Sequence, residues 1–477
     1  MESEGENYAQ MSWSLNYLRY AAATMNTLFF GGNIFAPSRY IDGTPIQDWL
    51  QDHFIEAMKH TARRLKDCSA VVGFGTFNEP HYGFIGLKDL NKHYAVNAVS
   101  GAVPTAFQAM ASASGFPQDI VRYTLAGKIK KPGKEKLNPS GISVFRKGYT
   151  CPWREAGVWT VENDVPVLKK KDFFATIPSQ SDTVGVRPAD FCEYFLKPFQ
   201  KKFMETVSKK HKHYIFFTES VPMSECVIWH PDERTGPDGN PFSIVDAVHW
   251  YDGPTLLLKK WRPVITADSL NRSPVIGKGA TKENIKKQIA EIADRPRSKG
   301  VASFIGEFGV PFDLDDGKSY RTGDYSAQEE ALGVYYDGID AALVHSTIWN
   351  YSASNTHEHG DGWNKEDLSI YSASTGEGRA VKGFCRPYAM AIAGIPVLMQ
   401  FDQTKREFIL EWEAVPGVTE IFVPEIWYPE GWEAELESLL AKIDADAVME
   451  KSPEKQRLYI TLTRGSHLRV RVFPLSV

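Results

Sequence analysis

Two glutamates in this chain follow short apolar, β-prone runs, and turn residues come directly after each. Glu79 lies in FGTFNEP (74–80) and Glu307 in VASFIGEF (301–308). Side chains at the carboxyl ends of parallel barrel strands meet at one rim even when they are far apart in sequence. Two carboxylates there suit retaining glycoside hydrolysis, in which one protonates the leaving oxygen and the other attacks the anomeric carbon. The sequence therefore predicts that Glu79 and Glu307 form a catalytic pair.

Several other residues stand where such a pair needs support. Asn78 precedes Glu79 and could hold the sugar 2-hydroxyl, a contact that strengthens in the transition state. His249 and Tyr251 lie two apart on one predicted strand, so they face the same side and could orient the nucleophile. Trp349 ends the run STIW and offers an apolar face on which a sugar ring could stack.

Two other groups of residues compete with this interpretation. Glu219 also ends a predicted strand, in FFTESVP, and is the rival candidate for the nucleophile, although a plain rim residue explains it better. His357, His359 and Asp361 have a spacing that could bind a metal, but a polar loop over the sugar site accounts for them equally well. We predict no metal and no cofactor, because two carboxylates and water suffice for the reaction.

Strand-like runs alternate with amphipathic helical runs along most of the chain. The strands are short and almost continuously apolar, as in a parallel sheet that is covered by helices. The predicted strands are residues 70–77, 213–219, 246–252, 302–308 and 345–351, and the predicted helices are residues 47–67, 188–210, 281–299 and 326–343. This alternation favours an α/β fold of the (β/α)8, or TIM-barrel, type.

The pattern changes at about residue 385, where apolar and polar residues begin to alternate with a period of two. Such alternation predicts a C-terminal antiparallel β-sandwich. The predicted domains are therefore a glycosidase domain over residues 1–384 and a sandwich over residues 385–477.

Three segments of the predicted barrel domain depart from the strand–helix pattern or have two possible roles. Residues 83–187 interrupt the alternation and form a long Gly-, Pro- and Lys-rich insertion. The lysine run 128–136 within it reads most simply as a solvated loop, and docking onto an anionic membrane is its functional alternative. Segment 21–37 is either a lipid-facing lid or, more simply, part of the core.

Composition narrows the function classes. A net charge of -5 disfavours nucleic-acid binding, which needs a basic face. Five dispersed cysteines without a CxxC pair fit a reducing compartment. The N-terminal residues lack the architecture of a signal peptide, and no apolar run reaches the length of a transmembrane helix. We expect a cytoplasmic protein or one peripheral to an intracellular membrane. The sequence makes no prediction of oligomeric state.

The rim residues together carry a resemblance. Asn78-Glu79-Pro80, His249-x-Tyr251, Gly306-Glu307-Phe308 and Trp349 resemble the rim residues of strands four, six, seven and eight of glycoside hydrolase family 5. In more detail, FFGGNIFAP (29–37), NEPHYGFIG (78–86) and DGWNKEDLSIYS (361–372) resemble the endoglycoceramidase-related branch, which includes fungal glucosylceramidases and steryl β-glucosidases.

This resemblance implies roles for individual residues. Glu79 would be the acid/base and Glu307 the nucleophile, while Asn364 and Glu366 become candidates for binding glucose hydroxyls. It also implies a retaining β-glucosidase that releases glucose from a glycolipid, either steryl glucoside or glucosylceramide, with peripheral contact to a membrane. The alternatives are a glycosidase that acts on soluble β-linked oligosaccharides and an inactive fragment that retains glycolipid binding.

One feature departs from the family. The family places an Arg on strand two and a His after strand three, and neither is found upstream of Glu79. Only about seventy residues precede the strand that ends at Asn78, too few for three βα units of thirty or so residues each. We therefore expect a (β/α)8 barrel that lacks its first three βα units, in a chain that begins after strand three.

Overall fold

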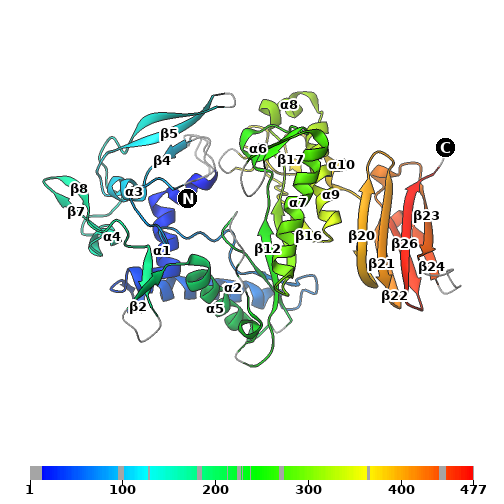
Figure 1. Ribbon diagram of the computed structural model, residues 1–477, viewed down its shortest axis with the longest axis horizontal. Coiled ribbons are helices and arrows are strands. Elements are labelled where there is room, and N and C mark those ends of the chain that lie inside the picture. The colour runs from blue at the N-terminus through cyan, green and yellow to red at the C-terminus, as the bar shows by residue number, and fades with distance from the viewer. Residues whose placement is uncertain are drawn as a thin grey trace. The chain divides into compact units, whose positions relative to one another are not determined.

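The structure, a computed structural model, describes residues 13–94, 101–126, 129–179, 185–211, 213–222, 227, 229–236, 238–267, 273–362, 366–439 and 447–475. The chain divides into two compact units (Figure 1). Unit 1 comprises Met1–Val248 and Pro296–Ala302, and unit 2 comprises His249–Arg295 and Ser303–Val477.

Three parallel strands form the sheet of unit 1. They are β3 (Gly73–Gly75), β11 (Ile215–Thr218) and β12 (Ser243–His249), with β11 in the middle. The Cβ of any residue other than glycine at position 73 would stand 1.9 Å from the carbonyl oxygen of Ile215, so only glycine lets these two strands approach so closely. β3 and β11 lie within runs that the sequence predicts to be strands, and β12 begins three residues before the predicted run 246–252 and ends within it.

Three helices build the core of unit 1: α1 (Tyr20–Phe35), α2 (Ile46–Leu65) and α5 (Lys197–Ser208). Figure 1 shows α2 and α5 side by side, and both contribute to one apolar cluster. Phe30 of α1 and Phe199 of α5 pack edge to face within it and are 1% exposed. Segment 21–37 therefore belongs mainly to the core, as the simpler interpretation holds.

The described residues of the insertion over residues 83–187 contain regular strands that its composition does not predict. It contains the antiparallel sheet β4 (Gly101–Val103), β5 (Gln118–Ala126) and β6 (Ile129–Leu137). The interpretation of the lysine run as a loop was therefore wrong, because most of it lies in β6. Lys136 pairs directly with Asp119 across the two strands, with Nζ 3.2 Å from the carboxylate. Cross-strand ion pairs stabilise a strand that lacks apolar alternation.

Unit 2 contains two parallel strands, β15 (Ala302–Phe308) and β16 (His345–Ile348). Helices α7 (Lys278–Arg297) and α9 (Ser326–Ala341) contribute to the same apolar core as β15. Gly338 explains how closely the two helices pack, because a Cβ there would lie 2.7 Å from the side chain of Ile289. These four elements confirm four predicted ones, with ends shifted by a few residues.

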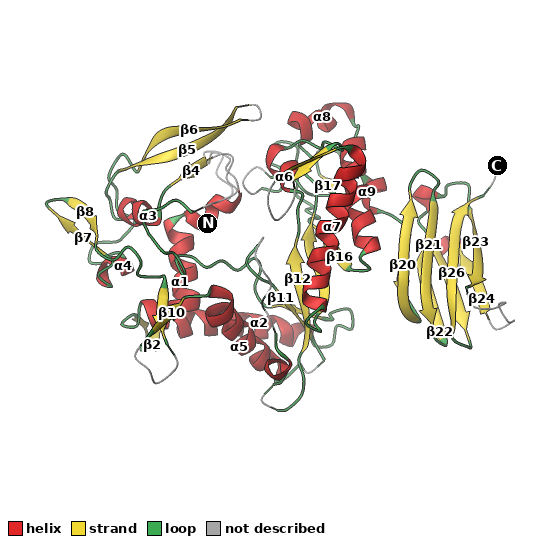
Figure 2. Ribbon diagram, in the orientation of Figure 1, coloured by secondary structure: helices red, strands yellow, loops and turns green. Residues whose placement is uncertain are grey.

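The C-terminal part of unit 2 consists of antiparallel strands, shown in yellow in Figure 2. Two four-stranded sheets, ordered β19-β22-β25-β24 and β20-β21-β26-β23, share one core cluster. The strands are β19 (Tyr388–Ala391), β20 (Gly394–Asp402), β21 (Glu407–Ala414), β22 (Gly417–Phe422), β23 (Trp432–Ser438), β24 (Ala447–Ser452), β25 (Arg457–Leu462) and β26 (Ser466–Pro474). The predicted antiparallel sheets are confirmed, and the domain boundary at residues 384/385 stays a prediction.

Shorter elements connect these parts. They are η1 (Trp13–Leu18), β1 (Tyr40–Ile41), β2 (Thr44–Pro45), α3 (Ala106–Ala113), α4 (Pro152–Glu155), β7 (Trp159–Glu162), β8 (Val165–Leu168), β9 (Thr176–Pro178), β10 (Val186–Pro188), η2 (Cys192–Leu196), η3 (Pro231–Arg234), α6 (Gly253–Leu258), β13 (Ile265–Ala267), β14 (Pro274–Ile276), α8 (Leu314–Thr322), β17 (Tyr371–Ser372), β18 (Glu377–Gly378), α10 (Val381–Phe384), η4 (Glu425–Trp427) and η5 (Pro453–Lys455). Among the described residues, no helix has the length and apolar character needed to cross a membrane.

Candidate active site

Glu307 lies near the end of β15 in unit 2, and its carboxylate is held from two directions. The hydroxyl of Tyr251 donates a hydrogen bond to Oε1 at 2.6 Å, and Nδ1 of His249 lies 3.4 Å from Oε2. The backbone N–H of Trp250 donates to the Glu307 carbonyl oxygen at 2.9 Å. The structure thus brings together the three side chains that the sequence predicts to meet. A carboxylate held in this way is aimed before substrate arrives.

Trp349 follows β16 and stands beside the end of β15. Its backbone N–H donates to the carbonyl oxygen of Phe308 at 2.7 Å, so the position of its Cα is fixed relative to Glu307. Its side chain is 45% exposed. An indole that is anchored at its backbone and open on its surface can offer a face to a sugar ring, as the sequence predicts.

The loop after Trp349 is closed by the carboxylate of Asp361. Oδ2 accepts hydrogen bonds from Asn350 Nδ2 at 3.1 Å and from the Leu368 N–H at 2.8 Å, while Oδ1 accepts from Asn355 Nδ2 at 2.8 Å. The Asp361 N–H donates to the carbonyl oxygen of Glu366 at 2.8 Å. One side chain therefore ties the residue after Trp349 to the base of the loop that carries Glu366. Asn364 lies outside the described residues.

A buried ion pair between Asp367 and Arg379 stabilises this loop. Arg379 is 1% exposed and donates from Nη1 to Oδ2 of Asp367 at 2.9 Å. The hydroxyl of Tyr320 also donates to Asp367, and burial together with that carboxylate raises the pKa of Tyr320. Tyr320 therefore stays a hydrogen-bond donor over the whole pH range in which proteins are folded.

The histidines of HEHGD serve the same loop. The ring of His357 stacks on that of Tyr320, with centroids 4.2 Å apart, and burial lowers the pKa of His357. His359 Nε2 lies 3.8 Å from a carboxylate oxygen of Glu358. Because Asp361 already accepts three N–H groups, these contacts favour the polar-loop interpretation over a metal site.

Glu79 lies in unit 1, four residues beyond the end of β3 at Gly75, and its backbone has a positive φ of 44°. The Glu79 N–H donates a hydrogen bond to Oε2 of Glu219 at 2.8 Å. The hydroxyl of Tyr17 donates a hydrogen bond to Oε2 of Glu79 at 3.2 Å. Gln200 Nε2 in turn donates to the carbonyl oxygen of Glu219 at 2.7 Å. The contacts of Glu219 therefore suit the support of Glu79 better than the role of a rival nucleophile.

A small pocket opens beside Glu79. Its volume is about 270 Å³, and it is lined by Tyr17, Met25, Asn26, Phe29, Phe77, Asn78 and Glu79. One carboxylate faces a wall that is mostly apolar, so the pocket suits a ligand whose apolar part lies next to an oxygen that accepts a proton. Asn78, predicted to hold a sugar hydroxyl, lines the same space.

His81 extends the support of Tyr17. Its ring stacks on that of Tyr17, with centroids 4.1 Å apart and an interplanar angle of 2°, and its Nδ1 accepts the Gly83 N–H at 3.1 Å. Burial lowers the pKa of His81 to about 3, so the imidazole is neutral at physiological pH.

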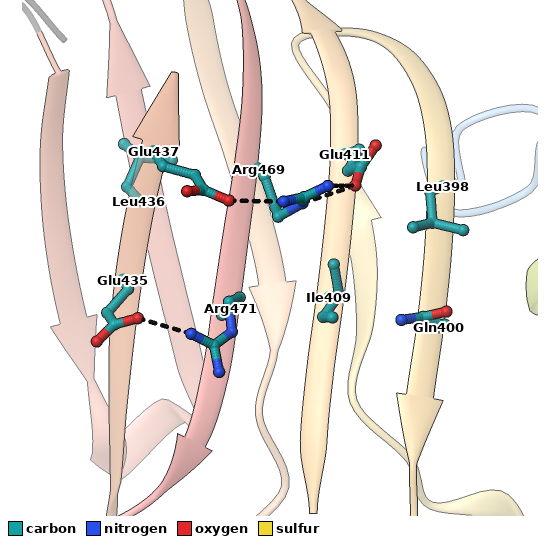
Figure 3. A pocket seen from close by; sticks show the side chains of 9 residues that line it. All are labelled: Leu398, Gln400, Ile409, Glu411, Glu435, Leu436, Glu437, Arg469 and Arg471. Atoms are coloured by element: carbon teal, nitrogen blue, oxygen red, sulfur yellow. Dashed lines mark hydrogen bonds and ion pairs between the residues drawn. The ribbon is translucent and has the colours of Figure 1, made fainter. Parts of the chain in front are cut away.

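A larger hollow of about 660 Å³ lies on the C-terminal sheet (Figure 3). It is lined by Leu398, Gln400, Ile409, Glu411, Glu435, Leu436, Glu437, Arg469 and Arg471. Arg469 bonds Glu411 at 2.6 Å and Glu437 at 2.8 Å, one on each neighbouring strand. Because its carboxylates are paired with arginines, this face is better explained as an ionic ladder across the sheet than as a catalytic site.

Comparison with known proteins finds relatives over most of this chain. Residues 386–472 match the glycoside hydrolase family 5 C-terminal domain. A glucosylceramidase of Rhizopus delemar is 31% identical over 458 residues, which cover 88% of this chain and 65% of that protein. An ergosteryl-beta-glucosidase of Saccharomyces cerevisiae is 32% identical over 77% of this chain and 52% of its own length. The chain belongs to glycoside hydrolase family 5.

Solved structures extend the comparison. Sterylglucosidase 1 of Cryptococcus neoformans has a TM-score of 0.84 at 25% identity, over 98% of this chain and 73% of that one. Endo-glycoceramidase II from Rhodococcus sp. has a TM-score of 0.53 at 15% identity and shares the fold. The chain spans between 52% and 65% of the length of the curated relatives that it matches.

Sequence reasoning missed three parts of the site. Tyr17 lies in η1, outside every predicted element, and its contact with Glu79 joins residues 62 positions apart. The contact of Glu219 with Glu79 spans 140 positions. The pair Asp367–Arg379 was also missed, because its partners lie 12 positions apart and the charged neighbours Glu377 and Lys382 give Arg379 the pattern of a surface residue.

His81 yields a prediction for the pH dependence of stability. The unfolded chain protonates this residue near pH 6.5 but the folded chain only near pH 3, so the stability present above pH 6.5 is lost as pH falls toward 3. The free energy of unfolding should fall by about 2 kcal/mol from this residue alone between pH 7 and pH 5. Denaturant unfolding of the parent and of His81→Gln should show a flatter pH profile for the variant.

The exposed His53 on α2 provides the control. His53→Gln should keep the pH slope of the parent protein. An unchanged slope in His81→Gln would show that His81 takes up its proton equally in the folded and unfolded chains.

Proposed function

We propose that this chain is a retaining β-glucosidase that hydrolyses a glucosylated lipid, either a steryl glucoside or a glucosylceramide. The observation that carries the proposal is the hydrogen bond of 2.6 Å from Tyr251 to Glu307, together with His249 on the other carboxylate oxygen. The names of the relatives, glucosylceramidase and ergosteryl-beta-glucosidase, support the substrate class. We also propose that the parallel strands of this chain belong to a (β/α)8 barrel.

In the first step, a carboxylate oxygen of Glu307 attacks the anomeric carbon. The bond from that carbon to the glycosidic oxygen breaks, and the proton of Glu79 passes to the departing oxygen. The lipid alcohol leaves, and glucose stays bound to Glu307 as an ester. Tyr251 keeps the nucleophile aimed, because its hydroxyl donates a hydrogen bond to Oε1 of the Glu307 carboxylate.

In the second step, the ionised Glu79 takes a proton from water. The hydroxide equivalent attacks the anomeric carbon, the ester bond breaks, and Glu307 leaves as a carboxylate. Glucose is released with its original anomeric configuration, and both glutamates return to their starting protonation states. No cofactor enters either step.

The apolar pocket beside Glu79 supports a lipid aglycone. The acid must reach the glycosidic oxygen, so the first atoms of the leaving group lie next to Glu79. Here those neighbours include Met25, Phe29 and Phe77. We assign the sugar contacts to Asn78, Trp349, Asn364 and Glu366. Hydrolysis of soluble oligosaccharides gains no comparable support from these walls.

The roles of the glutamates can be separated by substitution. Glu307→Gln should lower turnover by several orders of magnitude on every substrate, because no covalent intermediate can form. Glu79→Gln should lose roughly 10²–10⁴-fold on a steryl glucoside but far less on an activated aryl glucoside, whose leaving group needs no proton. Steady-state rates on both substrates measure the difference.

Glu219 provides the matched control. Glu219→Gln keeps an oxygen that can accept the Glu79 N–H and should retain most of the activity. Parent-like rates for Glu307→Gln, with loss in Glu219→Gln, would move the nucleophile to Glu219.

Tyr17 should affect only the acid. Tyr17→Phe removes the hydrogen bond to Glu79 Oε2 but keeps the ring that stacks on His81. Its kcat should fall roughly tenfold on substrates with poor leaving groups and stay near the parent value on activated aryl glucosides. An equal loss on both classes would show a structural effect on the site instead.

The substrate class has its own test. Detergent-dispersed steryl glucoside or glucosylceramide should release glucose, and cellulose and mannan should release no detectable sugar. Chromatography of the products measures both. Efficient release of cello-oligosaccharides would contradict the lipid aglycone and favour a soluble polysaccharide substrate.

A further inference from the structure

Exposed apolar side chains gather at one place in unit 1. Among the described residues, five large apolar side chains are at least 68% exposed. Three of these lie within eight residues of one another: Ile142 at 69%, Val144 at 68% and Tyr149 at 73%. Single exposed apolar residues are ordinary, but a cluster of the most exposed ones calls for a partner.

The backbone of this segment is fixed. The N–H of Val144 donates to the carbonyl oxygen of Ala113 at 2.9 Å, and the Asn138 side chain bonds both the N–H and the carbonyl oxygen of Ile142. Phe145 turns inward and packs edge to face on Tyr20, with centroids 5.9 Å apart. Ile142 and Val144 are therefore held outward by an anchored chain.

Basic residues stand between the apolar ones. Arg146 and Lys147 are both exposed and lie within the same eight residues, which contain no acidic residue. Over residues 132–149 there are four basic residues and one acidic residue, Glu135, which pairs with Arg122. The local charge is thus opposite in sign to the net charge of -5 of the whole chain.

We propose that the 142–149 surface, formed by Ile142, Val144, Arg146, Lys147 and Tyr149, docks the protein onto a bilayer that contains anionic lipids. This inference rests on the proposed function, because a glucosylated lipid substrate lies in a bilayer. The apolar side chains enter the interface and the cations meet the lipid phosphates and carboxylates. Tyr149 combines an apolar ring with a polar end, which suits the interfacial region.

A bilayer explains the features better than a protein partner. The apolar residues project from a loop that bends at Val144 and turns at Lys147–Gly148, and a fluid interface accepts projecting side chains without a matching surface. The positive charge of Arg146 and Lys147 also favours a membrane. A chain of net charge -5 is repelled by an anionic membrane unless a basic surface faces it.

Vesicle co-sedimentation of the full chain tests the proposal without turnover. The probes are phosphatidylcholine vesicles with and without roughly one third phosphatidylserine. The parent should bind the anionic vesicles more tightly, and added salt should weaken binding. Ile142→Ser with Val144→Ser should lower the partition constant roughly tenfold. Arg146→Gln with Lys147→Gln should lower it about as much, on anionic vesicles only.

Val186→Ser and Ile276→Ser are the matched controls, because these residues are 71% and 72% exposed but lie elsewhere in the chain. They should bind as the parent does. Failure of the parent to bind anionic vesicles, or equal binding by parent and patch variants, would overturn the proposal. So would equal losses in the controls.

Hydrolysis separates this inference from the proposed function. The patch variants should keep the parent rate on a soluble aryl glucoside and lose activity on glucoside embedded in anionic vesicles. A parent that binds vesicles but hydrolyses no glucoside contradicts the proposed function and leaves the docking result standing. A parent that hydrolyses but never binds contradicts the docking surface alone.

Discussion

The hydrogen bond from Tyr251 to Glu307, 2.6 Å long, is the contact on which the proposed chemistry depends. A nucleophilic carboxylate must be ionised and aimed, and its aim holds only if its backbone cannot shift. β15 meets that condition because Ile305 and Phe308 on either side of Glu307 are fully buried in the core that α7 and α9 also build. The N–H of Trp250, bonded to the Glu307 carbonyl oxygen, then fixes the chain that presents Tyr251. The buried side chains of β15 thus hold the strand in place, and this fixes the position of the Glu307 carboxylate.

Glu79 is held by a different principle. It stands outside the strands, with a φ of 44° that costs an ordinary residue about 1–3 kcal/mol. Its N–H bonds a carboxylate oxygen of Glu219, a charge-assisted contact that offsets part of this strain. The two glutamates therefore differ in the way the proposed roles require. The proposed nucleophile sits on a rigid strand, and the proposed proton donor sits at a turn where backbone conformation, Tyr17 and Glu219 together set its direction.

The sequence predicted the parts of the fold and site that local pattern encodes. Apolar runs that end at Asn78, Glu219 and Glu307 mark strands, and the spacing of His249 and Tyr251 places both on one side. Pattern fails where stability comes from pairing across the chain. The sequence of β6 predicts a loop because it is polar and lacks apolar alternation. Its strand conformation depends on partners on the neighbouring strand, such as Asp119 for Lys136, which the local pattern does not reveal. Tyr17 was missed for the same reason, because its partner is 62 residues away.

The pair Asp367–Arg379 shows how such distant contacts shape a site that neither residue enters. Isolated burial of either charge is costly, and a buried ion pair seldom adds stability over apolar residues of the same size. Here the pair provides directional hydrogen bonds, which apolar residues cannot provide. Asp367 accepts from Arg379, Tyr320 and Asn355 at once, and Asn355 passes the connection on to Asp361. Asp361 holds Asn350, the residue after Trp349. A chain of directional bonds therefore runs from the core to Asn350, the residue after Trp349, and it fixes the loop in one shape where apolar packing would allow several.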